Sequence, residues 1–329
     1  MTSCVSILSG WISSQPRRRQ PEAAVALLAA AVLACAPVGR AWADEGGSGY
    51  WLPGSFGWQA AVPSAVGFSI ETAYYHATQS TDPSLNVTRG NNAISGLYTS
   101  SNFLLVTPTY AMPTPSLGGQ MEFSVTFQMG NYTAADAGTT IADSMTAMGD
   151  LSPMVAQKWV WDVHNLMVYG AGNVPIGNYD PSRLATTGLG RWAVDGGLGY
   201  TYYDDKSGRE FSAVLGLTYN FMNQSTAYQS GMDLHLDLSA SQALNDNVYA
   251  GVVGYIYNQI TGDTGSGATL GAFPARVIGV GPQLGYNFTL GGRDIQMNGR
   301  SYYEIAGQNR PAGWNAWLTF TVALAKSEK

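Results

Sequence analysis

Apolar and polar residues alternate along much of this chain. Between residues 232 and 241, every even position carries Met, Leu or Ala, and every odd position carries Asp, His or Ser. The same period of two recurs in residues 121–129 and 211–221. This is the period of a β-strand, whose successive side chains point to opposite faces, and it excludes a helix. Each strand therefore needs one apolar and one polar environment, which a soluble sandwich or a membrane barrel can supply.

Extended along the chain, this pattern predicts twelve strands. They span residues 67–77, 101–112, 119–132, 151–161, 165–176, 191–203, 209–222, 231–242, 247–260, 275–289, 294–305 and 313–324. Most have 11 residues or more. Strands of soluble sheets usually have about five or six residues, whereas a tilted membrane-spanning strand has about 9 to 11. The strand lengths therefore favour a membrane barrel.

The predicted connections alternate in length. Short turns lie at residues 113–118, 162–164, 204–208, 243–246 and 290–293. Mostly longer, polar loops lie at residues 78–100, 133–150, 177–190, 223–230, 261–274 and 306–312. Short turns at one end and long loops at the other are typical of outer-membrane barrels with both termini in the periplasm. We predict an all-β fold, a single transmembrane antiparallel β-barrel of about 12 strands over residues 67–324, with a C-terminal tail at 325–329.

The first 43 residues have the features of a secretory signal peptide. Three arginines at 17–19 precede an apolar run of 14 residues from Ala23 to Ala36, and Ala41-Trp42-Ala43 forms a cleavage site. The run is shorter than the roughly 20 residues of a bilayer-spanning helix. A lipoprotein signal centred on Cys35 is the alternative, but Leu33 just before the alanine fits it poorly. We predict export and location in the outer membrane of a Gram-negative bacterium.

Composition narrows the class further. Cleavage after Ala43 removes both cysteines, four arginines and Glu22, and leaves 12 basic against 21 acidic residues. Nucleic acid is thus not an expected partner. Charged residues make up 12% of the chain, against about 25% in an average soluble protein. Beyond the leader, no run of 18 apolar residues exists, so a closed barrel remains the way to cross a membrane.

If the apolar rows face lipid, the polar rows face the lumen, because a basic side chain facing lipid at mid-bilayer costs about 2–4 kcal/mol. The lumen-lining candidates are Glu71, Glu122, Asp195, Asp233, His235, Asp237, Arg300 and Glu304. Two readings stay open: these residues line a path, or they pair with one another and fill the lumen.

An enzymatic or metal-dependent role is disfavoured. Neighbouring side chains on one face of a strand, such as Asp233, His235 and Asp237, lie about 7 Å apart, too far to orient one another. His76, Ser80 and Asp82 lie together in sequence near the end of the first strand but match no nucleophile motif. We expect no metal, no cofactor and no catalysis, with a barrel hydrolase as a disfavoured alternative.

Residues 44–66 precede the first strand and are too irregular to form one. The aromatic residues Trp51, Phe56 and Trp58 lie there among glycines and prolines. Large aromatic side chains seldom stay fully solvated. The segment is predicted either to insert these rings into the lumen as a plug or to rest as a tail against the periplasmic base.

Three motifs carry a family resemblance. They are Gly-Tyr-Trp-Leu-Pro-Gly at 49–54, Gly-Pro-Gln-Leu-Gly-Tyr at 281–286 and Asn-Arg-Pro-Ala-Gly-Trp-Asn-Ala-Trp-Leu-Thr at 309–319. The chain resembles the outer-membrane proteins named for the meta-pathway of phenol degradation, over essentially the whole mature sequence. The resemblance implies a bacterial outer-membrane barrel that is encoded near genes for aromatic catabolism and usually described as a transporter.

These observations predict a channel for passive passage of small hydrophobic or aromatic compounds. Passage is expected to be passive because the chain lacks a Walker-type loop for nucleotide binding. The expected partners are outer-membrane lipid, the small solute and the outer-membrane assembly machinery. The alternative is a barrel with a closed lumen and a structural or adhesive role.

Overall fold

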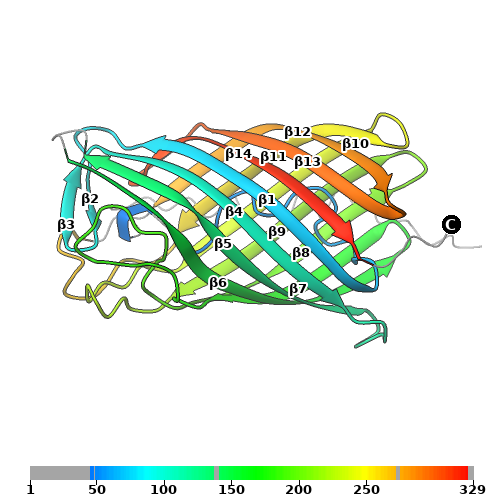
Figure 1. The fold of residues 1–329 in the computed structure, drawn as a ribbon, viewed down its shortest axis with the longest axis horizontal. Coiled ribbons are helices and arrows are strands. Elements are labelled where there is room, and N and C mark those ends of the chain that lie inside the picture. Colours follow the sequence, from blue (N-terminus) through cyan, green and yellow to red (C-terminus); the bar gives the residue numbers. More distant parts are fainter. Residues whose placement is uncertain (1–44, 48, 137–140, 272–274, 325–329) are drawn as a thin grey trace, which may run out of the picture. The chain divides into compact units, whose positions relative to one another are not determined.

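The computed structural model describes residues 45–47, 49–136, 141–271 and 275–324 (Figure 1). The predicted signal peptide and the predicted C-terminal tail lie outside the described residues. No helix in the described part of the chain is long and apolar enough to cross a membrane.

Twelve strands form a closed antiparallel barrel, as predicted, in which neighbours in the barrel are neighbours in sequence and β14 closes on β1 (Figure 1). They are β1 (Gly67–Ser80), β4 (Leu97–Ala111), β5 (Gln120–Asp136), β6 (Ala142–Trp161), β7 (His164–Asn173), β8 (Ala193–Asp204), β9 (Arg209–Asn220), β10 (Asp233–Ala243), β11 (Val248–Gln259), β12 (Arg276–Leu290), β13 (Arg293–Glu304) and β14 (Ala312–Ala323). Because all strands are paired on both sides, the sheet has no free edge.

Three smaller elements are not part of the barrel wall. The hairpin of β2 (Asn86–Arg89) and β3 (Asn92–Ser95) lies in the connection between β1 and β4, and the 3₁₀ turn η1 (Glu45–Gly47) precedes β1. The connections after β1, β7, β9, β11 and β13 lie at one end of the barrel, here called the loop end. The opposite end, where β1 begins and β14 ends, is called the turn end.

Side chains along each strand alternate between an apolar outer face and the interior. On β8, Val194 and Leu198 are 49% and 61% exposed, whereas Asp195 between them is 7% exposed. On β10, Asp233, His235 and Asp237 are all buried. The alternation in the sequence therefore places leucine and valine outside and the acidic row inside.

The prediction of a long loop at residues 133–150 is wrong. β5 continues to Asp136 and β6 begins at Ala142, nine residues before the predicted start at 151. Side chains 142–148 alternate in exposure, but most are Ala, Ser and Thr, so hydrophobicity does not reveal this strand. A register shift between Phe127 and Met129 further obscures the period.

Candidate transport passage and N-terminal strap

Residues 49–66, here called the strap, run inside the barrel and are held by acidic side chains of the wall. The Asp237 carboxylate on β10 accepts the backbone N–H of Gly54 at 2.9 Å and that of Phe56 at 3.0 Å. An irregular segment leaves most of its backbone N–H groups without partners, and buried ones need acceptors. Asp237 supplies two acceptor oxygens at one point.

The same arrangement recurs toward the turn end. Glu210 on β9 accepts the N–H of Gln59 at 3.2 Å, and Glu122 on β5 accepts that of Ser64 at 2.7 Å. Lys158 on β6 pairs with Glu122 at 3.1 Å and donates to the Val62 carbonyl at 3.0 Å. These bonds fix residues 59–64 of the strap to β5, β6 and β9.

Aromatic stacking also attaches the strap to the wall. Trp51 stacks on His235 with ring centroids 3.9 Å apart and planes 14° apart, and Trp58 stacks on Tyr249 at 3.8 Å and 12°. Phe56 lies 5.5 Å from Trp51, centroid to centroid. The three aromatic residues of the predicted plug thus all contact rings, and two of them contact the barrel wall through close parallel stacking.

Glycine is required at one bend of the strap. Gly54 has a φ of +85°, in the left-handed region that favours glycine, and a Cβ there would lie 2.8 Å from the Tyr302 ring. Backbone strain and steric overlap both disfavour any side chain at this position. The Gly54 residue of the first family motif therefore allows the close approach to the wall.

The structure distributes the remaining lumen candidates over separate clusters. His235 Nε2 lies 2.9 Å from Asp195, which also accepts a bond from Thr218. Asp233 accepts a bond from Asn220 at 2.7 Å. These groups lie among wall strands β8 to β10.

Arg300 and Glu304, four residues apart on β13, bond different partners. Arg300 donates to the Ser55 carbonyl at 3.0 Å and lies 5.2 Å from the Trp317 ring centroid. Glu304 accepts bonds from Gln79 on β1 and Tyr255 on β11, each two strands away from β13 in the barrel. The guanidinium therefore faces the strap, and the carboxylate joins wall strands.

His76 and Asp82, which were considered for chemistry, do not bond each other. His76 bonds Asn102 at 2.8 Å, while Asp82 bonds Ser84 at 2.5 Å, so the sequence neighbours His76 and Asp82 have different partners. Within the described residues, no group of three or more His, Cys, Asp or Glu side chains could hold a metal ion.

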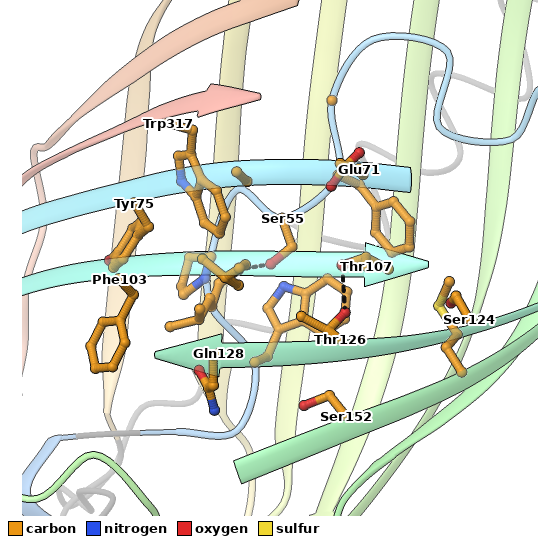
Figure 2. A pocket seen from close by; sticks show the side chains of 18 of the residues that line it. Ser55, Glu71, Tyr75, Phe103, Thr107, Ser124, Thr126, Gln128, Ser152 and Trp317 are labelled. Carbon is orange, nitrogen blue, oxygen red and sulfur yellow. Dashed lines mark hydrogen bonds between the residues drawn. The ribbon is translucent and has the colours of Figure 1, made fainter. Parts of the chain in front are cut away.

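A cavity of about 890 Å³ lies beside the strap, along the wall formed by β1, β4, β5 and β6 (Figure 2). Its wall carries mainly neutral polar and aromatic side chains. Those labelled in Figure 2 are Tyr75, Phe103, Thr107, Ser124, Thr126, Gln128, Ser152 and Trp317, with the carboxylate of Glu71. The lining extends from Arg183 at the loop end to Asp294 at the turn end. The cavity therefore follows the strap between both ends of the barrel.

Several lining residues were not among the sequence candidates. Ser124, Thr126 and Gln128 occupy the polar row of the segment 121–129 and could have been found from its alternation alone. Tyr75, Phe103 and Trp317 face inward although they are apolar or aromatic. The pattern misses them because a lumen filled by an aromatic strap also accepts apolar wall residues.

Fold and interior together define an outer-membrane-type β-barrel whose lumen is partly filled by its own N-terminal segment. The chain belongs to the family described as "Putative MetA-pathway of phenol degradation", whose model matches residues 83–320. No curated protein matches the chain.

Several solved structures are similar to this chain. An outer membrane channel from Pseudomonas putida F1 is 15% identical, with a TM-score of 0.66, over 80% of this chain and 98% of that one. A FadL homologue from Pseudomonas aeruginosa is 10% identical, with a TM-score of 0.36, over 79% of this chain and 75% of that one. The transport unit of the autotransporter AIDA-I from Escherichia coli is 9% identical, with a TM-score of 0.42, over 79% and 90%. At these identities, the first similarity shows the fold.

Proposed function

We propose that this protein is an outer-membrane channel through which small hydrophobic or aromatic molecules pass without energy coupling. The observation that carries this proposal is the cavity beside the strap, whose lining residues reach both ends of the barrel. Ligand pockets in proteins commonly have volumes of about 300–1,000 Å³. The barrel would lie in outer-membrane lipid after export by the predicted leader and insertion by the assembly machinery.

The chemistry of the lining favours a neutral solute. The Glu122 carboxylate is paired with Lys158, and the Arg300 guanidinium is engaged by the strap and Trp317. Hydroxyl groups, amide groups and the rings of Tyr75 and Phe103 make up much of the remaining wall, beside the carboxylate of Glu71. A ring with one polar substituent can stack on such side chains and exchange its hydrogen bonds along the path.

Three further observations support channel function over catalysis. The fold relative from Pseudomonas putida is described as a channel. The titratable residues considered for chemistry are divided among structural clusters. The family description points to aromatic catabolism. Together they support uptake of an aromatic compound rather than its conversion.

Planar-bilayer recording of the purified protein tests the proposal. Reproducible conductance steps that are blocked in a concentration-dependent manner by phenol would support it. Absence of conductance, together with unchanged uptake of labelled phenol in a deletion strain, would overturn it. A second candidate function is that of a closed structural barrel, because the strap partly fills the lumen. Absence of conductance together with unchanged phenol uptake would support this second function. Different gel mobility before and after boiling is the prior check that the barrel is folded.

A further inference from the structure

The segment that leads into the strap is anchored at the loop end of the barrel. The backbone N–H of Glu45 donates to Ser230 Oγ at 3.3 Å, and its carboxylate lies 3.7 Å from the Arg191 guanidinium. Tyr179 and Asn223 each donate to this carboxylate at 3.1 Å. We call these five residues the outer anchor.

The outer anchor is buried and well satisfied. Glu45 is 5% exposed and Arg191 is 2% exposed. A buried ion pair is tolerated when further hydrogen bonds satisfy the charged groups, and here two additional donors reach Glu45. Burial and the nearby Glu45 carboxylate raise the pKa of Tyr179 to about 12, so its hydroxyl remains a donor at physiological pH. The contact is therefore a specific seat for Glu45.

The location of this seat fixes the direction in which the chain runs. Tyr179 and Arg191 lie in the connection between β7 and β8, and Asn223 and Ser230 lie in that between β9 and β10, all at the loop end. Gly47 packs against Pro311, in the connection between β13 and β14 at the same end. By contrast, the strap reaches Glu122 through Ser64 and enters β1 at Gly67, at the turn end.

The chain thus runs the length of the lumen before the first strand begins. Figure 1 shows η1, in blue, near the β2–β3 hairpin, at the end of the barrel opposite the end of β14. Outer-membrane barrels place their longer loops outside the cell and their short turns in the periplasm. The N-terminal end of the strap therefore lies at the cell-surface end of the barrel, although the chain reaches the outer membrane from the periplasm.

We propose that the N-terminal end of the processed protein is held at the cell surface by the outer anchor. Cleavage after Ala43 would leave one residue ahead of Glu45.

Cysteine labelling tests the proposal, because both native cysteines, Cys4 and Cys35, lie in the predicted leader. The probe variant is Asp44→Cys. Ser266→Cys is the surface control, in the β11–β12 connection, and Asp205→Cys is the periplasmic control, in the β8–β9 turn; both positions are exposed. Intact cells are treated with a membrane-impermeant maleimide, and the barrel is checked by its mobility without boiling.

We expect labelling at Asp44→Cys within about twofold of that at Ser266→Cys, and labelling of Asp205→Cys only after permeabilisation of the outer membrane. Labelling at Asp44→Cys only after permeabilisation, or only after denaturation, would overturn the proposal. If this variant does not fold, a short epitope inserted between Asp44 and Glu45 and probed with antibody on intact cells gives the same two outcomes. A barrel that conducts nothing would still show the expected labelling, so failure of the channel proposal is a separate result.

Discussion

Replacing Asp237 by Asn should loosen the strap without altering the barrel. The carboxylate accepts two strap N–H groups, from Gly54 and Phe56. Asn retains one acceptor oxygen and turns an N–H donor toward the second group. A hydrogen bond to a charged partner contributes about 1.5–3 kcal/mol, and neutral bonds about half as much. We expect seating of the strap to weaken by about 2–3 kcal/mol, which corresponds to a roughly 30- to 150-fold larger ratio of unseated to seated strap.

Single-channel recording in planar bilayers measures this ratio as the time spent in a higher-conductance state. Limited proteolysis near Phe56 gives an independent measure of unseating. Glu304→Gln is the matched control, because it removes a lumen carboxylate whose side-chain donors, Gln79 and Tyr255, belong to wall strands. The reasoning is refuted if Asp237→Asn leaves both conductance and cleavage unchanged, or if Glu304→Gln changes them equally.

Three further changes test other parts of the structure. Leu198→Arg, at the middle of β8 on the outer face, should destabilise the barrel by about 2–4 kcal/mol in lipid, measured by urea unfolding in liposomes; an unchanged midpoint would contradict the assignment of this face to lipid. Lys158→Met leaves the buried Glu122 carboxylate unpaired and should cost about 3–5 kcal/mol, while Lys158→Met with Glu122→Gln should recover part of the loss in the same assay; strictly additive effects would argue against the ion pair. Trp58→Ala removes the ring stacked on Tyr249 and should raise conductance while the folded gel mobility is retained; conductance equal to that of the unmodified protein would show that this ring does not narrow the passage.

The sequence predicts the barrel well because lipid and lumen impose a period of two on every spanning strand. It fails for residues 142–150, where the outward row of Ala142, Ser144 and Thr146 is no more apolar than the inward row of Asp143, Met145 and Ala147. For the interior, alternation locates the acidic row but not its partners. Asp237 meets Gly54 across 183 residues of sequence, and nothing local in either segment specifies the other.

The direction of the strap is a second feature that local patterns do not reveal. Trp51, Phe56 and Trp58 indicate a segment that avoids water, which is equally true of a plug and of a tail at the barrel base. The distinction depends on Glu45, whose partners at 179, 191, 223 and 230 lie in loops without periodicity. A single acidic residue near a predicted cleavage site gives no sign of a buried seat.

The acidic row of the lumen acquires a common physical role from these contacts. A segment with neither helix nor strand partners must satisfy its backbone N–H groups individually, and inside a barrel only the wall or trapped water can do so. Asp237, Glu210 and Glu122 provide oxygens at three levels of the wall, facing N–H groups of residues 54, 56, 59 and 64. On this argument, a protein with few charges places carboxylates in its lumen to hold the strap, and neutral side chains of β4 and β5, such as Phe103, Thr126 and Gln128, remain along the cavity for solute.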